Sequence, residues 1–99
     1  MRKFMVTITL PEELDDNFWT LIPEHRELIT QMMNNEIIVS YAINNSRTSG
    51  WIVVNAETRE EAIRTIKKFP IYSYYLDVEI EELFLFDTSY SGLPKLVLN

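Results

Sequence analysis

The spacing of apolar side chains changes along this chain, and this alternation limits the possible folds more than any other feature. Apolar residues occupy every second position of residues 4–10, which predicts a strand ending at Pro11, because proline cannot donate to a strand ladder. The helical spacing of about 3.6 residues follows over residues 16–33. The remaining expected elements are strand, strand, helix and strand, at residues 36–43, 51–55, 58–69 and 76–80. The predicted order is therefore β-α-β-β-α-β.

Local signals mark where the two helices start. Either Asp15 or Asp16 suits the N-cap of the first helix, because a carboxylate accepts hydrogen bonds from the unpaired backbone N–H groups there. Thr58 and Glu61 have the spacing of a capping box, which predicts the start of the second helix. Pro23 lies inside the first helical stripe, so we expect a kink there or a helix that begins near Pro23. The stripe continues in phase across Pro23, which favours a single helix.

This order of elements predicts an α+β fold of the ferredoxin-like type, in which two helices cover one face of a four-stranded antiparallel sheet. Residues 36–43 and 51–54 carry apolar side chains on both faces of their strands. We therefore expect these strands to be central and buried on both faces, although the chain has no further element for the second face. The same surface of another copy is the simplest cover, so we expect a homodimer or a higher homo-oligomer.

The length of 99 residues suits one domain, which we assign to residues 1–87. After Glu82 the alternation is lost, which predicts a bulge or a strand that leaves the sheet. Residues 88–99 form a C-terminal tail with an apolar segment at 93–98. We expect this segment to strap across the partner subunit; a frayed terminus is the alternative.

Charge and composition exclude several classes of function. The 15 acidic and 9 basic residues, with a net charge of −6, argue against a nucleic-acid partner or an anionic membrane surface, both of which require clustered positive charge. No cysteine is present, which removes disulfides and cysteine metal sites and agrees with a reducing compartment. The sequence shows neither a secretion signal nor an apolar run of the ~20 residues that a membrane-spanning helix needs, so we expect a cytoplasmic protein. Without a phosphate-binding or dinucleotide motif, and with acidic pairs that suit helix starts, we expect neither cofactor nor metal.

Four segments carry a resemblance to a known family. They are Leu10-Pro11 at the end of the first strand, the strand 51–54, the helix start 58–62, and the turn and strand 69–80, which reads Phe-Pro-Ile-Tyr-Ser-Tyr-Tyr-Leu-Asp-Val-Glu-Ile. Together they resemble the muconolactone isomerase family of the dimeric α/β barrel superfamily, over about residues 3–86. The resemblance implies a ferredoxin-like fold, two sheets that face each other as a barrel, and often larger rings of dimers. It also implies a cofactor-free proton shift on a small lactone carboxylate.

A proton shift needs a base held beside the substrate, and three residues are candidates. His25 is the only histidine, and its place on the first helical stripe suits either a base at the edge of a cavity or a hydrogen-bonded packing residue. Asp77 and Glu79 share one face of the last strand, where a dry barrel would let a carboxylate act as the base. A solvated strand face, or an edge charged against aggregation, is the alternative for both.

We also expect a small-molecule cavity between the sheet and the helices. The side chains expected to line it, besides His25, are Thr7, Thr9, Tyr41, Trp51 and Tyr74. Aromatic walls with a few hydroxyls suit a small ring-bearing or apolar ligand, whereas the same side chains would also suit a dimer core. Residues 36–43 carry no Arg, Lys or His, where the resembled family has basic residues, and the nearest basic group is Arg47. Arg47 is therefore the candidate for binding a substrate or, alternatively, a solvated loop residue.

The sequence thus predicts a small-molecule-binding protein similar to the muconolactone isomerases. Its candidate activity is a cofactor-independent isomerisation, by proton transfer, of a small lactone or unsaturated metabolite. The alternative is a non-catalytic ligand-binding or oligomeric assembly module. Proton exchange in a small unsaturated substrate separates the two, because a binding module leaves the proton in place.

Overall fold

The computed structural model describes residues 1–89. Its elements are, in order, β1 (Arg2–Thr9), α1 (Asp16–Asn34), β2 (Ile38–Ile43), β3 (Ser49–Ala56), α2 (Arg59–Lys67), the short 3-10 turn η1 (Tyr72–Tyr74) and β4 (Asp77–Glu82). The predicted order β-α-β-β-α-β is confirmed, with the ends of the elements shifted by a few residues. The tail segment 93–98 lies outside the described residues, so its expected contact with a partner stays a prediction.

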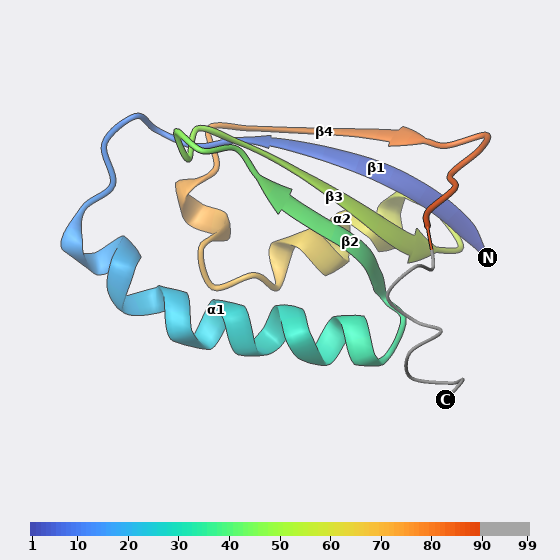
Figure 1. Ribbon diagram of the computed structural model, residues 1–99, viewed down its shortest axis with the longest axis horizontal. Coiled ribbons are helices and arrows are strands. Elements are labelled where there is room, and N and C mark those ends of the chain that lie inside the picture. Colours follow the sequence, from blue (N-terminus) through green and yellow to red (C-terminus); the bar gives the residue numbers. More distant parts are fainter. Residues whose placement is uncertain (90–99) are drawn as a thin grey trace.

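The strands form one antiparallel sheet in the order β2-β3-β1-β4, and both helices lie on the same face of it (Figure 1). This is the ferredoxin-like α+β fold that the sequence predicts. The expectation that β2 is a central strand was wrong, because β2 lies at an edge. The helical crossover between β1 and β2 leaves room for one strand between them, and β3 fills it.

The core lies between the sheet and the two helices. Val6 of β1 points toward the helices, and it pairs with Ile52 of β3 on one side and Ile80 of β4 on the other. Ile29 of α1 and Ile66 of α2 are almost fully buried in the same core. Burial of one such side chain contributes about 1.5–3 kcal/mol, so the helices are held mainly by this apolar layer.

Both helices begin at caps that the sequence predicts. The Asp15 carboxylate accepts a hydrogen bond from the Phe18 backbone N–H at 2.9 Å, which makes Asp15 the N-cap of α1. α1 then continues through Pro23, which confirms a single helix. At α2, the Thr58 hydroxyl oxygen accepts from the Glu61 backbone N–H at 3.1 Å. The Glu61 carboxylate completes the cap by accepting from the N–H of the residue before Thr58.

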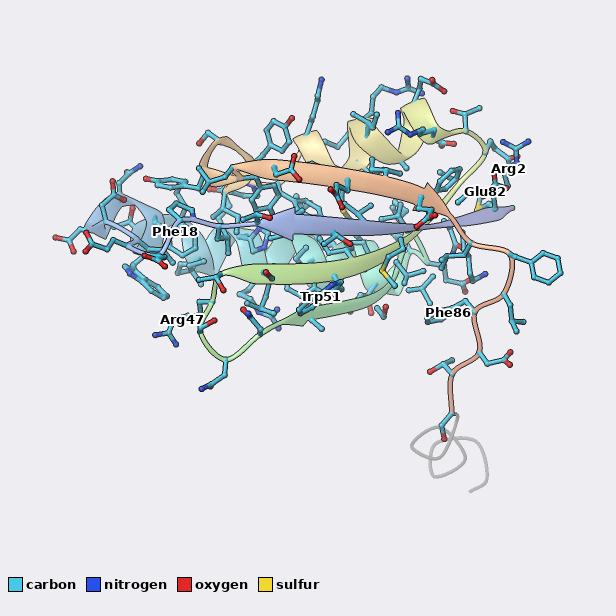
Figure 2. The ribbon with its side chains drawn as sticks, turned by 90° about the horizontal axis from the view of Figure 1, so that it is seen from above. Arg2, Phe18, Arg47, Trp51, Glu82 and Phe86 are labelled. Atoms are coloured by element: carbon cyan, nitrogen blue, oxygen red, sulfur yellow. The ribbon has the colours of Figure 1, made fainter. Side chains whose placement is uncertain are left out.

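The second face of the sheet is not covered by either helix, and Figure 2 looks onto this open face. Strand pairing places Met5 and Thr7 of β1 on it, beside Trp51 and Val53 of β3. The side chain of Trp51 is 40% exposed, whereas that of Val53 is 1% exposed. The acidic residues of β4 flank them on the other side of β1. The open face is therefore apolar over β3 and acidic over β4.

The sheet ends near Glu82. The Leu83 backbone N–H still donates to the Lys3 carbonyl at 2.8 Å, and the chain then turns away from the strand (Figure 1). An exposed ion pair of 3.5 Å joins Arg2 to Glu82 at this end. Of the two predicted alternatives, a strand that leaves the sheet is therefore the observed one.

Candidate functional site

A cavity of about 350 Å³ opens between α1, β2 and the loop that joins β2 to β3. Phe18, Trp19 and Ile22 form its helix wall, and Ile43 forms part of its sheet wall. The polar side chains that line it are His25, Arg26, Tyr41, Asn44, Asn45 and Arg47. Three of the predicted site residues, His25, Tyr41 and Arg47, are therefore brought together here.

His25 and Tyr41 form a buried polar pair at this cavity. A hydrogen bond of 2.7 Å joins the imidazole Nε2 to the phenolic oxygen. His25 lies on the inward side of α1 and is only 1% exposed. The ring of Phe69 packs edge-on against the imidazole, with 5.3 Å between the ring centres. The histidine is thus held in one orientation by a hydrogen bond and an aromatic contact.

A β-bulge in β2 turns Tyr41 toward the cavity. Ile38 and Tyr41 both face the helices, where they pair with Val54 and Ile52 of β3. In a regular strand, residues three positions apart point to opposite faces. The register shift between Ile38 and Ser40 adds one residue to β2 and brings Tyr41 back to the helix-covered face. The bulge is therefore what makes the pair with α1 possible.

Burial keeps both members of this pair neutral over a wide pH range. Desolvation lowers the pKa of His25 to about 4, and the positive charge of Arg26 acts in the same direction. Desolvation raises the pKa of Tyr41 to about 12, and Arg26 partly opposes this change. At neutral pH the cavity therefore presents a neutral imidazole and a neutral phenol.

Two buried polar atoms near the pair have no hydrogen-bond partner among the described residues. They are Nδ1 of His25 and the hydroxyl oxygen of Tyr75. Burial, and then the neighbouring Tyr41, raise the pKa of Tyr75. An unsatisfied buried polar group costs about 1–3 kcal/mol, so such groups are expected to bind water or a ligand. Within the pair itself, Nδ1 of His25 therefore remains able to form a hydrogen bond.

Two arginines at the cavity each lie over an aromatic ring. The guanidinium carbon of Arg26 is 5.9 Å from the centre of the Tyr41 ring. That of Arg47 is also 5.9 Å from the centre of a ring of Trp19. Within residues 1–89 the one ion pair joins other side chains, so neither guanidinium has an acidic partner there. Both keep N–H groups free to bind other molecules.

The loop at residues 44–48 positions Arg47. The side-chain oxygen of Asn44 accepts hydrogen bonds from the backbone N–H groups of Thr48 and Ser49, at 2.9 and 3.0 Å. The Arg47 N–H donates to the Asn44 carbonyl at 3.0 Å. Arg47 has a φ of 61°, in the left-handed region that glycine and asparagine favour.

The other predicted site residues lie away from this cavity. Thr7, Thr9 and Trp51 are on the open face of the sheet, and so are Asp77 and Glu79 of the edge strand β4. Thr7 pairs with Trp51 on one side and with Glu79 on the other. The expected cavity lining is thus divided between the two faces of the sheet, because successive strand residues point to opposite faces.

Tyr74 supports the start of α1. Its hydroxyl donates to the Asp15 carboxylate and accepts from the Asn17 side-chain amide, both at 2.9 Å. Its ring packs edge-on against Phe18. The hydrogen bonds from the Phe18 backbone N–H and from Tyr74 hold the pKa of the Asp15 carboxyl below its usual range. Tyr74 therefore holds Phe18, which lines the cavity, in its place.

Sequence reasoning missed Trp19 and Arg26. These residues are seven positions apart on α1, so they lie on one side of the helix, two turns from each other. They flank the apolar stripe at the positions that follow Phe18 and His25. The spacing shows that both residues lie on one side of α1. That this side faces the cavity depends on the β2–β3 loop, whose Arg47 packs against Trp19.

Comparison with known proteins identifies the fold and leaves the family open. No family model and no curated protein sequence matches this chain. Solved structures do match, among them 5-chloro-2-hydroxyhydroquinone dehydrochlorinase from Burkholderia phenoliruptrix AC1100, in complex with 2,5-dihydroxybenzoquinone. The TM-score is 0.57 at 9% identity, and the match covers 90% of this chain and 97% of that chain. At this identity the similarity shows a common fold alone, the four-stranded antiparallel sheet with two helices described above.

Within residues 1–89, no helix has the length and apolar content needed to cross a membrane. In the same residues, no three His, Asp or Glu side chains gather as a metal site requires.

Proposed function

We propose that this protein binds a small ring-bearing or unsaturated metabolite, such as a lactone, in the cavity between α1 and β2. We further propose that it isomerises this ligand by proton transfer, without a cofactor, as the resemblance to muconolactone isomerases suggests. The observation that carries the proposal is the buried His25–Tyr41 pair, joined by a hydrogen bond of 2.7 Å at the cavity. The similar fold of a dehydrochlorinase that holds 2,5-dihydroxybenzoquinone supports a small-molecule site. The cytoplasmic location stays a prediction of the sequence.

Isomerisation by proton transfer needs a base that is free of its proton and a donor beside it. Burial lowers the pKa of His25 to about 4, so its imidazole is available as a base at neutral pH. In the proposed reaction His25 takes a proton from a carbon of the ligand and leaves an enolate. It then returns this proton to a different carbon, so no net proton is gained or lost.

The low pKa of His25 restricts the substrate. A weak base removes only an acidic proton, such as one on a carbon between a carbonyl group and a double bond. The imidazolium and the enolate form together, and their opposite charges stabilise each other in a cavity of low dielectric constant. In this reaction Nδ1 of His25, which has no partner among the described residues, takes the proton, and Nε2–H donates to the Tyr41 oxygen. The hydroxyl hydrogen of Tyr41 is then free to bind the developing negative charge on the enolate oxygen. The proposed substrate is therefore an unsaturated carbonyl compound rather than a simple ester.

Exchange of solvent deuterium into an unsaturated γ-lactone, followed by NMR, tests the proposed reaction. We expect exchange with the wild-type protein and a loss of about 100-fold or more in His25→Gln, the range for a general base. Asp77→Asn and Glu79→Gln, on the open face, are the matched controls and are expected to keep the wild-type rate. An unchanged rate in His25→Gln contradicts the proposal. Loss of exchange in the two control variants instead assigns the chemistry to the carboxylates of β4.

The second candidate function is a non-catalytic binding or assembly module, and the open face of the sheet favours its assembly part. Trp51 is 40% exposed on this face, where it lies opposite Thr7 of β1, and Met5 and Val53 lie on the same side of the sheet. Exposed apolar surface of this kind is typical of an interface between copies. We infer that two copies pair through this face as a homodimer. Binding of a lactone without any exchange would support the module over the enzyme.

A further inference from the structure

We infer that Trp19 and Arg47 together close the outer end of the cavity, and that this closure restricts the ligand to a single ring without bulky substituents. The inference rests on the proposed function, because it concerns the same cavity and the same lactone ligand. It adds a size limit on the ligand and names the two side chains that set this limit.

The cavity has a buried end and an exposed end. His25 and Phe18 line the buried end, where they are 1% and 3% exposed. Trp19 and Arg47 also line the cavity, but both residues are exposed, Trp19 by 46%. Figure 2 shows Arg47 at the same end of the molecule as Phe18. A ligand that reacts at His25 therefore has its reacting carbon at the buried end and its opposite side toward Trp19 and Arg47.

A contact between Trp19 and Arg47 joins two walls of the cavity. Trp19 belongs to α1, whereas Arg47 belongs to the loop between β2 and β3. The guanidinium carbon of Arg47 is 5.9 Å from the centre of a ring of Trp19, within the range of a cation–π contact. The contact therefore spans the gap between α1 and the loop at the exposed end of the cavity. A substituent that extends from the ligand ring in this direction meets the two side chains.

Neighbouring residues hold both sides of this contact in place. The ring of Trp19 packs edge-on against the buried ring of Phe18, with 5.1 Å between the ring centres. On the other side, the Asn44 side-chain oxygen accepts from the Thr48 backbone N–H at 2.9 Å. The Thr48 carbonyl accepts from the Leu10 N–H at 2.8 Å, which ties the loop to the chain just after β1. The closure is therefore a fixed wall that limits size, rather than a flap that moves aside.

The backbone of Arg47 fits this role. Its φ of 61° lies in the left-handed region, which is uncommon for a residue other than glycine. Such conformations persist where the surrounding structure fixes them, and they concentrate at ligand sites. Here the hydrogen bonds to Asn44 fix the backbone, and the side chain that leaves it reaches Trp19.

The size of the cavity gives the closure a measurable consequence. Its volume of about 350 Å³ is near the lower end of the range for ligand pockets. If the exposed end were open, an added phenyl group would lie on the apolar wall and raise the affinity by about fourfold for each buried CH₂-sized group. Behind a fixed closure the same phenyl group has no room, so it lowers the affinity. The two cases predict changes of opposite sign.

Titration calorimetry with an unsaturated γ-lactone and with the same lactone carrying a phenyl group tests this inference. We expect the wild-type protein to bind the phenyl lactone about tenfold or more weakly than the parent lactone. Trp19→Ala is expected to bind the phenyl lactone about tenfold more tightly than the wild-type protein does, and Arg47→Asn about threefold more tightly, because only part of the wall is then lost. The affinity of both variants for the parent lactone is expected to change by less than about threefold.

Two further variants are the matched controls. Trp19→Phe keeps a ring beneath the guanidinium, so it is expected to keep the exclusion of the phenyl lactone. Arg59→Gln removes a positive charge outside the cavity and is also expected to keep it. Asparagine suits the φ of 61°, so Arg47→Asn is expected to melt at the wild-type temperature or above it.

The outcomes separate this inference from the proposed function. Equal or tighter binding of the phenyl lactone by the wild-type protein overturns the closure and leaves the proposed function intact. Unchanged exclusion in both Trp19→Ala and Arg47→Asn also overturns it, because another part of the wall would then set the limit. Loss of exclusion in Arg59→Gln has the same meaning. Failure of the wild-type protein to bind the parent lactone at millimolar concentration contradicts the proposed function itself.

Discussion

His25 is kept neutral by the side chains that surround it. α1 places the imidazole against Tyr41 and Phe69, which exclude water from it. Arg26, the next residue on the helix, further disfavours a positive charge on the ring. Tyr75 is held neutral as well, because burial raises its pKa, so it offers the imidazole no negative partner. The same histidine on an open surface would titrate near its ordinary value.

We expect the free energy of unfolding to decrease between pH 6.5 and pH 4 because of His25. The unfolded imidazole binds a proton with a pKa of 6.5, whereas the folded one binds it only near pH 4, so the unfolded state holds more protons in this interval. The contribution is complete above pH 6.5 and is lost as the pH falls. Urea unfolding at pH 7.5 and pH 4.5 is expected to show a loss about 2 kcal/mol larger in the wild-type protein than in His25→Gln. An imidazole NMR titration with a midpoint near 6.5 in the folded protein would contradict this account.

The β2–β3 hairpin determines the sheet side of the candidate site. The bulge after Ile38 directs Tyr41 to the helices, and the loop that follows directs Arg47 to Trp19. Gly50, the second residue of β3, lets this hairpin pack closely. A Cβ atom at this position would lie 2.6 Å from Cδ1 of Ile43, which lines the cavity, and 3.1 Å from the buried Ile8.

Gly50→Ala is expected to lower the free energy of unfolding by about 1–2 kcal/mol. The added methyl group overpacks the hairpin, and this cost exceeds the gain from a stiffer unfolded chain. Ser49→Ala is the matched control, because Ser49 points to the open face of the same strand, and a change within about 0.5 kcal/mol is expected there. Urea unfolding of both variants measures the difference. Equal stability of Gly50→Ala and the wild-type protein would show that the hairpin has room for a side chain.

At the scale of the whole molecule, the sheet has two faces with different roles. The helix-covered face holds the core and the cavity, whereas the open face carries Trp51 beside apolar residues and a row of carboxylates along β4. A sheet face that contacts only water is expected to be polar throughout. The apolar part of the open face is therefore the surface that we expect a second copy to cover.

Trp51→Lys is expected to convert a dimer into a monomer, because the lysine would carry a charge into the centre of the apolar patch. Met33→Lys is the matched control, since Met33 is 38% exposed on α1, close to the 40% of Trp51. Sedimentation equilibrium at micromolar concentration measures the masses of the wild-type protein and both variants. A wild-type monomer at this concentration, or a monomer in both variants, would rule out self-association through the open face.

The type and order of the elements could be predicted from the sequence alone. Apolar spacing, the caps at Asp15 and Thr58 and the break at Pro11 are local features, and they require no knowledge of distant contacts. The ferredoxin-like sheet follows from this order, because short connections allow few other arrangements. His25, Tyr41 and Arg47 could also be singled out: His25 is the only histidine, Tyr41 is an aromatic side chain of the second strand, and Arg47 is the nearest basic group to that strand.

The assembled fold alone determines which of these side chains meet. The bulge in β2 moves Tyr41 to the helix-covered face, and one register shift of this kind leaves no trace in apolar spacing. Thr7 and Trp51 lie on the opposite face of the sheet, because successive strand residues point to opposite faces. The pKa of His25 depends on burial, and the left-handed backbone at Arg47 depends on how the loop closes. Both result from contacts between residues that are not neighbours in the sequence. Local chemistry therefore specifies the elements, and long-range packing specifies the site.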